Sequence, residues 1–339
     1  MQNSPFLKPL PTQIAVIGSG SWATAIIKIL TQNSVKITWH IRNKKDADYI
    51  KKYYHNPRYL TDVQVNPRKV KTTTSLQTAI KNAEYIILAM PSAFLMDTLK
   101  PLNKTHFEGK KIVSAIKGMV PEKNLLVTDW LETQFGVNPK NIAVIAGPCH
   151  AEEIALEKQS YVTIASPDLK TSQHFGSLMR CRFVNSNAII DMDGVEYCAI
   201  MKNIIAMACG ITHGLGFGDN FQAVLVSNAM EEIKRLLDAI SPNPRELYGS
   251  GYLGDLLVTS YSKFSRNRSF GNMVGRGYSI KSAQVEMNMI AEGYYAVKSI
   301  WEINKKFQIN LPIINAVYRI LYEKAQPMVE IDLLKAQLK

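Results

Sequence analysis

The chain of 339 residues is 46% hydrophobic and 20% charged, which excludes disordered and collagen-like proteins and fits two globular domains of ordinary size. Its formal net charge of +12 permits a nucleic acid, an anionic membrane surface or small anionic ligands as partners. Because the basic residues occur as scattered doublets, such as Lys44 with Lys45, and no nucleic-acid-binding motif is found, we expect a solvated basic surface and no nucleic-acid partner.

Short β-branched runs alternate with helical stretches from Gln13 to about Asn187. This alternation predicts βαβ units and a parallel sheet. The helical periodicity is clearest at residues 22–30 and 125–135. The expected strands lie at residues 14–17, 35–39, 85–89, 112–114, 142–146 and 161–165, with a further short strand at 183–185.

Beyond about Asp191 the strand-like runs end, and long stretches rich in Ala, Met, Leu and Ile follow, broken by glycine clusters at residues 214–218 and 249–254. We therefore expect an α/β protein in which an N-terminal Rossmann-like, doubly wound sheet is followed by an all-α C-terminal domain. The expected domains are residues 1–190, which bind the nucleotide, and residues 191–339, which bind the substrate. The active site is expected in the cleft between them.

The first expected strand runs into a glycine-rich loop with the pattern G-x-G-x-x-A, formed by Gly18, Gly20 and Ala23. In dinucleotide-binding folds the first glycine permits a tight turn, the second lets the backbone approach the pyrophosphate, and the third small residue allows close helix–strand packing. The helix N-terminus then faces the anion. A glycine turn without a ligand is the alternative, but the flanking strand and helix favour the cofactor site.

The end of the second expected strand carries the signal for cofactor choice. An NAD-specific site places an acidic residue there, about twenty residues beyond the loop, for the ribose 2′-hydroxyl. This chain has Trp39, His40, Ile41 and Arg42 instead. The planar guanidinium of Arg42 suits a 2′-phosphate, which favours NADPH and leaves NADH as a second cofactor. An ordinary surface arginine fits the spacing equally well.

From Cys198 to Ile211 every residue is apolar or glycine except Lys202 and Asn203. A helix that is apolar on all sides is normally buried, and lysine is rarely fully buried without a partner. Desolvation lowers the pKa of a lysine towards neutrality, which suits proton transfer. The alternative is that Lys202 reaches solvent at a helix edge.

Two polar motifs follow in the helical half. Asp255 and Thr259 are four residues apart and therefore lie on one helical face, although Asp255 could equally cap its helix. Residues 265–268, with the sequence Ser-Arg-Asn-Arg, offer guanidinium groups and polar donors suited to a substrate phosphate, or they form an ordinary polar loop.

We expect a cytoplasmic protein without membrane insertion. No run of about 18 uncharged apolar residues is present, and Pro5, Pro9 and Pro11 interrupt the N-terminal segment, where a signal peptide needs a continuous apolar stretch. The cysteines form no Cys-x-x-Cys pair, which favours reduced thiols and predicts neither disulfides nor a metal site. They are Cys149, Cys181, Cys198 and Cys209.

Together with further motifs, these residues resemble the soluble NAD(P)-dependent glycerol-3-phosphate dehydrogenases over nearly the whole chain. Several blocks in the same order carry the resemblance. They are the Gly18 to Ala23 loop, Ile-Lys-Gly at 116–118, Ala-Gly-Pro at 146–148, Ala-Glu-Glu at 151–153, Met-Lys-Asn at 201–203, Gly-Leu-Gly-Phe-Gly-Asp-Asn at 214–220, Gly-Asp-Leu at 254–256, Ser-Arg-Asn-Arg at 265–268 and Ala-Glu-Gly at 291–293.

The resemblance implies a role for each matching position. Lys202 would be the catalytic acid/base, Lys117 and Asn203 would lie beside the reacting carbonyl, and Asp255 and Thr259 would belong to the same polar cluster. The substrate would be bound by Lys117, Gly147, Cys149, Lys202, Asp255, Ser265, Arg266 and Asn267, with Arg266 and Asn267 at its phosphate. The cofactor would be lined by Gly18, Gly20, Ser21, Trp22, Arg42, Lys117, Ala151, Arg266, Ile290 and Glu292.

Three positions depart from the family pattern. Ala23 stands where glycine is usual, Met201 where leucine or valine is common, and Cys149 where serine or threonine is usual. The fingerprint permits alanine, and methionine is close in volume to leucine. Only Cys149 therefore puts a substrate hydrogen bond in question.

The resemblance further implies reduction of dihydroxyacetone phosphate to sn-glycerol 3-phosphate, which feeds phospholipid synthesis. A homodimer is one of the oligomeric states that the sequence leaves open. One rival is a two-domain dehydrogenase acting on another hydroxy acid or sugar acid, against which Arg266 and Asn267 argue. The other is a non-catalytic NADP(H)-sensing regulator, which would not need Lys202 inside an apolar helix.

Overall fold

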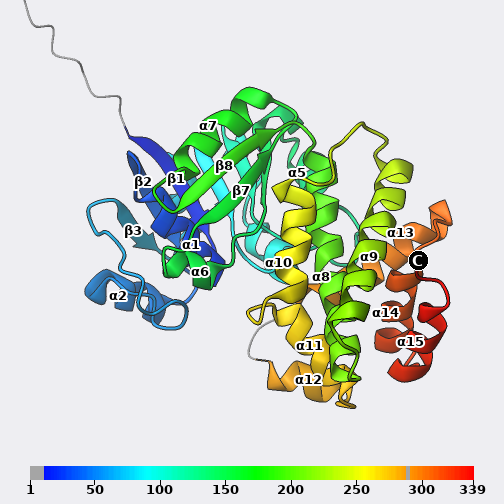
Figure 1. The fold of residues 1–339 in the computed structure, drawn as a ribbon. Coiled ribbons are helices and arrows are strands. Elements are labelled where there is room, and N and C mark those ends of the chain that lie inside the picture. The colour runs from blue at the N-terminus through cyan, green and yellow to red at the C-terminus, as the bar shows by residue number, and fades with distance from the viewer. Residues whose placement is uncertain (1–10, 288–290) are drawn as a thin grey trace, which may run out of the picture.

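The computed structural model describes residues 11–287 and 291–339. Strands and short helices form the N-terminal half, and long helices form the C-terminal half (Figure 1). The strands are β1 (Thr12–Ile17), β2 (Val35–His40), β3 (Val70–Thr73), β4 (Tyr85–Leu88), β5 (Lys111–Ser114), β6 (Ile142–Ala146), β7 (Ser160–Ala165) and β8 (Val184–Ile189).

The helices of the N-terminal half are α1 (Ser21–Leu30), α2 (Lys44–Tyr53), α3 (Leu76–Ile80), η1 (Ser92–Phe94), α4 (Leu95–Leu99), η2 (Lys104–Phe107), α5 (Val127–Phe135), η3 (Pro139–Asn141), α6 (Ala151–Ala155) and α7 (Leu169–Met179). The C-terminal half contains α8 (Met192–Gly214), α9 (Asp219–Ile240), η4 (Ser250–Gly254), α10 (Asp255–Tyr261), α11 (Arg266–Gly275), α12 (Ile280–Glu286), α13 (Glu292–Phe307), α14 (Pro312–Tyr322) and α15 (Pro327–Lys335).

The sheet has the order β3-β2-β1-β4-β5-β6-β7-β8. Its first six strands are parallel and follow the order of dinucleotide-binding folds, so the expected Rossmann-like class is confirmed. The expectation of a wholly parallel sheet is wrong at one place, because β7 runs antiparallel to β6. The sequence analysis also missed β3, whose four residues Val-Lys-Thr-Thr contain one large apolar side chain only.

Alternate residues of β1 belong to different cores, as the two-residue repeat of a strand requires. Ile14 and Val16 pack with α1 on one face of the sheet. Ala15 and Ile17 face the other way, into a core that continues through α8 and the C-terminal helices. The sheet is thus covered on both faces, which is why its strands read as continuous apolar runs.

The long helix α8 is the centre of the C-terminal half. It is the one described helix that is long and apolar enough to cross a membrane, yet 94% of its apolar window is buried inside the protein. It contacts α9, α10, α11 and α13. The contact with α11 is very close: a Cβ atom on Gly271 would lie 2.1 Å from the Met207 carbonyl oxygen, and one on Gly210 would lie 2.0 Å from that of Arg268.

The sheet order reverses between β1 and β4, and the loops after these strands form the floor of a cleft. Gly18 follows β1 with φ +121°, and a Cβ there would lie 2.1 Å from the Ala89 carbonyl oxygen after β4. The Gly18 carbonyl accepts a hydrogen bond of 2.6 Å from the Trp39 indole of β2. Only glycine can adopt this backbone angle and also leave room for the Ala89 carbonyl at the point where the strand order reverses.

Candidate active site

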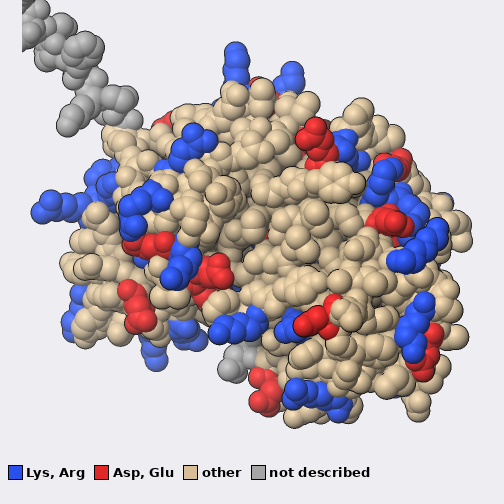
Figure 2. All heavy atoms as spheres, in the orientation of Figure 1, with Lys and Arg blue, Asp and Glu red and all other residues tan. Residues whose placement is uncertain are grey.

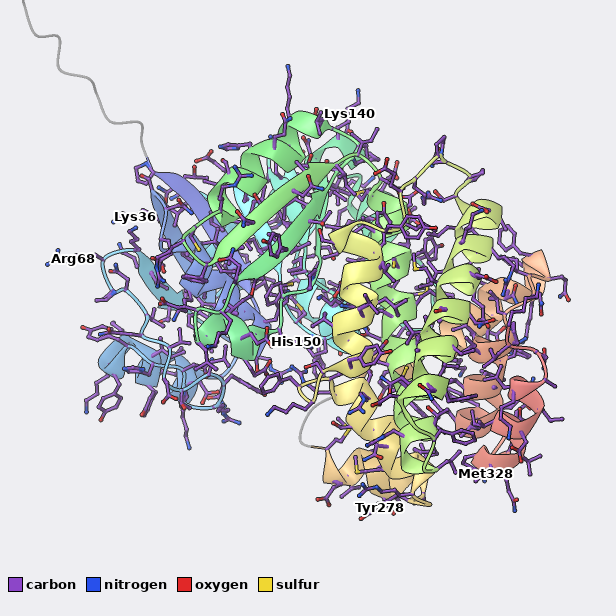
Figure 3. All side chains as sticks on the ribbon, in the orientation of Figure 1. Lys36, Arg68, Lys140, His150, Tyr278 and Met328 are labelled. Atoms are coloured by element: carbon purple, nitrogen blue, oxygen red, sulfur yellow. The ribbon has the colours of Figure 1, made fainter. Side chains whose placement is uncertain are left out.

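A cleft of about 970 Å³ extends from the sheet to the helical half. His150, labelled in Figure 3, lies where the two halves meet. The cleft is lined by most of the residues that the sequence analysis selected, namely Gly18, Gly20, Ser21, Trp22, Arg42, Lys117, Cys149, Ala151, Lys202, Asn203, Thr259, Ser265, Arg266, Asn267 and Glu292.

Two selected residues that the structure describes are not part of this lining. Gly147 and Asp255 lie directly behind it and are bonded to each other, because the Gly147 N–H donates a 3.0 Å hydrogen bond to Asp255 Oδ2. Ile290 lies outside the residues that the structure describes.

The N-terminus of α1 opens onto the cleft and suits a pyrophosphate. Gly20 is its N-cap, and no acidic residue occupies the first turn. A Cβ atom on Gly20 would have no neighbour within 4 Å, so the backbone there is open to a ligand. The buried indole Nε1 of Trp22 has no hydrogen-bond partner among the described residues. Free backbone donors, a positive helix end and an orphaned donor together fit a dinucleotide.

Arg42 lies at the far end of the cleft, just after β2. Its guanidinium carbon is 5.6 Å from the centroid of the Phe94 ring, a cation–π distance. The side chain is exposed, and Arg42 forms no ion pair among the described residues. Arg42 is therefore available to an anionic group bound at this end of the cleft.

The lysine singled out by sequence is buried and paired. Lys202 is 3% exposed and donates a hydrogen bond to Asp255 Oδ1, and Asp255 itself is 1% exposed. The alternative in which Lys202 reaches solvent is therefore wrong. The alternative in which Asp255 caps α10 is also wrong. The helix α10 continues directly from η4, and Gly254, the residue before Asp255, already has helical backbone angles.

A second cation shares the same carboxylate. Lys117 Nζ lies 3.8 Å from Asp255 Oδ2 and 5.5 Å from the centroid of the Trp22 ring. Lys117 comes from the loop after β5, Lys202 from α8 and Asp255 from α10. One carboxylate thus joins the sheet half to two elements of the helical half.

These charges shift one another's pKa values. Burial lowers the pKa of Lys202 to about 8, outweighing the attraction of Asp255. Burial also disfavours the charged form of Lys117, but Asp255, Cys149 and a hydrogen bond with Lys202 together outweigh this and raise the Lys117 pKa. Burial acts to raise the pKa of Asp255, yet the two ammonium groups hold it below its ordinary value. The site therefore combines a permanent carboxylate with a lysine that titrates near neutral pH.

A chain of amide hydrogen bonds runs along the cleft wall. Asn203 Nδ2 donates to the Lys117 carbonyl at 2.8 Å, and Asn203 Oδ1 accepts from Asn267 Nδ2 at 2.9 Å. Asn267 Oδ1 in turn accepts from the Gly293 N–H at 2.9 Å. These bonds fix which side of each amide faces the cleft, and they hold α11 beside α8. Arg266 of α11 and Lys202 of α8 line the same cleft.

Glu292 closes the cleft from the first turn of α13. Its carboxylate accepts hydrogen bonds from Ser92 N at 2.8 Å and from Ser92 Oγ at 2.7 Å. Burial raises the pKa of Glu292. Because Ser92 belongs to the sheet half, this contact ties the two halves together.

Two further selected residues, Cys149 and Thr259, are held by local hydrogen bonds. The Cys149 thiol donates to the Gly147 carbonyl at 3.0 Å, and burial raises its pKa. A neutral thiol engaged in this way gives a weaker polar contact than the hydroxyl usual in the family. Thr259 Oγ1 donates to the Asp255 carbonyl at 2.7 Å, so Thr259 supports the helix that carries Asp255.

The sequence analysis missed other residues of the cleft, notably Phe94 and His150. Phe94 follows β4, and ligands in doubly wound sheets bind at the carboxyl ends of strands, so this position had a usable signal. His150 is held neutral, because burial and the Lys202 and Lys117 charges lower its pKa to about 4. No spacing rule points to it.

The fold and this cleft define a two-domain, dinucleotide-binding oxidoreductase. The N-terminal domain of the NAD-dependent glycerol-3-phosphate dehydrogenases matches residues 13–172, and the C-terminal domain matches residues 191–332. The chain belongs to the NAD-dependent glycerol-3-phosphate dehydrogenase family. It is 35% identical over 332 residues to the glycerol-3-phosphate dehydrogenase [NAD(P)+] of Listeria innocua, covering 96% of this chain and 97% of the relative.

Other relatives and solved structures agree. The glycerol-3-phosphate dehydrogenase [NAD(P)+] of Staphylococcus carnosus is 32% identical, covering 92% of this chain and 94% of the relative. The structure of glycerol-3-phosphate dehydrogenase from Coxiella burnetii superposes with a TM-score of 0.89 at 29% identity, covering 96% and 99% of the two chains. A D-mandelate dehydrogenase superposes with a TM-score of 0.57 at 13% identity, covering 96% of this chain and all of that one, which shows a shared fold alone.

Proposed function

We propose that the chain reduces dihydroxyacetone phosphate to sn-glycerol 3-phosphate with a nicotinamide cofactor. The observation that carries the proposal is the buried Lys202–Asp255 pair at the wall of a dinucleotide cleft, in a chain of this family. The cofactor, when bound along α1, supplies the hydride. We assign to this chain the remaining tasks, which are to hold the substrate, move a proton and exclude water.

Proton transfer is assigned to Lys202. As the carbonyl carbon is reduced, negative charge develops on its oxygen, and an ammonium group beside it stabilises this charge and then donates its proton. Asp255 keeps Lys202 charged in an apolar helix, while Lys117 adds a second positive charge. The Asn203 amide, fixed by its bonds to Lys117 and Asn267, is assigned to orient the substrate.

The substrate phosphate is assigned to Arg266 and Asn267 at the start of α11. Replacing Arg266 with alanine should raise KM for dihydroxyacetone phosphate by roughly 10- to 150-fold, the scale of about 1.5–3 kcal/mol for a hydrogen bond to a charged group. Initial rates measured against substrate concentration test this. Lys263→Ala is the matched control, because it removes a nearby exposed charge that does not line the cleft. Equal KM values in the two variants would place the phosphate elsewhere.

We further propose a preference for NADPH over NADH, based on Arg42 at the end of β2. Replacing Arg42 with aspartate should lower kcat/KM for NADPH by at least about tenfold and spare NADH, because a charge-assisted contact becomes a like-charge clash. Lys44→Asp makes the same charge change at a neighbouring exposed position that does not line the cleft. A wild type that favours NADH, or a variant that loses both cofactors equally, would remove Arg42 from this role.

A substrate panel separates this function from its rivals. Dihydroxyacetone phosphate should be reduced, while dihydroxyacetone, which lacks the phosphate, and a small 2-keto acid should be poor substrates. Turnover of the keto acid alone would favour a dehydrogenase for another hydroxy acid. Cofactor binding with no turnover of any carbonyl compound would favour a regulator.

We also propose the domain division near residue 190 and a cytoplasmic location without membrane insertion. The division is supported by the end of β8 at Ile189 and the start of α8 at Met192. The location is supported by the burial of α8. On the face shown in Figure 2, basic side chains are spread over both halves rather than gathered in one patch, as expected of a solvated basic surface.

A further inference from the structure

A hydrogen-bonded network outside the cleft centres on Asp191, the residue before α8. Its Oδ2 accepts hydrogen bonds from Arg245 Nε at 2.7 Å and from the Tyr252 hydroxyl at 2.6 Å. Its Oδ1 accepts from Arg245 Nη2 at 3.0 Å and from the Gly194 N–H at 3.2 Å. Arg245 is only 4% exposed at its side chain. Bonds of this kind, to a charged and largely buried carboxylate, are among the stronger ones in proteins.

The network joins the two elements that carry the Lys202–Asp255 pair. Asp191 is the N-cap of α8, and Lys202 lies on that same helix. Tyr252 lies in η4, the turn that leads directly into α10, which begins at Asp255. Asp191 therefore holds the start of one element and the approach to the other with a single carboxylate.

The turn that carries Tyr252 has an unusual backbone. η4 is a single turn of π-helix, a rare conformation that is frequent at functional sites. It is held from the sheet side as well, because Ser250 Oγ lies 3.1 Å from Thr163 Oγ1 of β7. A Cβ atom on Gly251 would lie 3.0 Å from the Thr163 side chain, so the turn and the strand are already at their closest approach.

We propose that the Asp191–Arg245–Tyr252 network positions Asp255 against Lys202, with Tyr252 as the positioning residue. The proposal rests on the proposed function of the Lys202–Asp255 pair. Tyr252 lies outside the residues that line the cleft, so it acts through the backbone of η4 and not by touching the substrate.

Loosening η4 has a defined electrostatic consequence. The titratable groups that face Lys202 are Asp255 of α10, Lys117 in the loop after β5, and Cys149 and His150 in the loop after β6. Only Asp255 is an anion at neutral pH in this group. If its carboxylate withdraws, burial and the Lys117 charge act on Lys202 without compensation, and the Lys202 pKa falls further below about 8.

The test is Tyr252→Phe, which removes one hydroxyl and keeps the ring. Tyr322→Phe is a matched control, because the Tyr322 hydroxyl also makes one 2.7 Å hydrogen bond, to the Tyr294 carbonyl, and neither of these residues lines the cleft. We expect kcat for reduction to fall by at least about threefold in Tyr252→Phe, the scale of one hydrogen bond, with the cofactor Kd unchanged. The decline of kcat at high pH should begin at a lower pH. Tyr322→Phe should change neither.

A second measurement does not depend on turnover. Lysine labelled with ¹³C at Cε reports the titration of Lys202 by NMR, once the resonance is assigned by its absence in Lys202→Arg. The midpoint should move to lower pH in Tyr252→Phe and stay in place in Tyr322→Phe. An unmoved midpoint and an unchanged pH profile in Tyr252→Phe would overturn the network's role, whereas a moved midpoint in a protein that does not reduce dihydroxyacetone phosphate would overturn the proposed function alone.

Discussion

Replacing Lys202 with alanine is expected to lower kcat for dihydroxyacetone phosphate reduction by at least about 10²-fold, the lower end of the range for general acid catalysis. The loss is expected in kcat because the proton is transferred only as the alkoxide develops. Cofactor affinity should change little, since α1 and Arg42 do not depend on this side chain. Steady-state rates together with NADPH binding measured by fluorescence check both parts of the prediction.

The control for Lys202→Ala is Lys202→Met, which keeps the apolar stem in α8 and removes only the charged end. Both variants leave Asp255 with Lys117 as its remaining cationic neighbour, at 3.8 Å. Similar losses in the two variants, with cooperative thermal unfolding retained, would assign the effect to the ammonium group. Near-normal turnover in a folded Lys202→Met would show that another group donates the proton.

The substitution Asp255→Asn should produce the second large effect, a loss of at least about 10²-fold in kcat/KM at neutral pH. Removing one partner of a buried ion pair typically costs about 3–5 kcal/mol, and Lys202 is expected to avoid that cost by losing its proton. In the wild type the Lys202 pKa is about 8. Reduction needs the protonated form, so its rate should fall as the pH rises through about 8, while the reverse oxidation should rise.

In Asp255→Asn the same decline should begin at a lower pH, because the anion that favours the ammonium form is gone. A pH series of kcat/KM in both directions measures this shift. Asp129→Asn, which changes a partly buried carboxylate of α5 away from the cleft, is the matched control. If the two variants share one pH profile and one rate, Asp255 does not control the protonation of Lys202.

Local patterns predicted the parts of the site that are continuous in sequence. The glycine-rich loop is recognisable because strand, turn and helix follow one another within a few residues, and each glycine has a steric reason to be there. Lys202 is recognisable because a single cation in an apolar helix requires a buried partner. The helical half was expected to begin near Asp191, where α8 starts, because the strand-like runs end there and long apolar helical stretches follow.

The contacts between distant segments could not be predicted in this way. That Asp255 accepts from Gly147, and that Glu292 binds Ser92, follows from how the two halves pack, which no periodicity encodes. The antiparallel direction of β7 was missed because the composition of a single strand does not define its direction. The short β3 was missed because its four residues contain one large apolar side chain only. The π-helical turn at η4 lies in a glycine cluster that sequence alone indicates only as a break.

The most direct test of the account is a single-turnover reaction with protein in excess over NADPH, started by dihydroxyacetone phosphate and followed by NADPH absorbance and product analysis. The account predicts that each NADPH consumed yields one sn-glycerol 3-phosphate, and that Lys202→Met binds NADPH yet consumes it at least about 10²-fold more slowly. NADPH that stays bound and unoxidised in the wild type, or equal rates in the wild type and Lys202→Met, would contradict it.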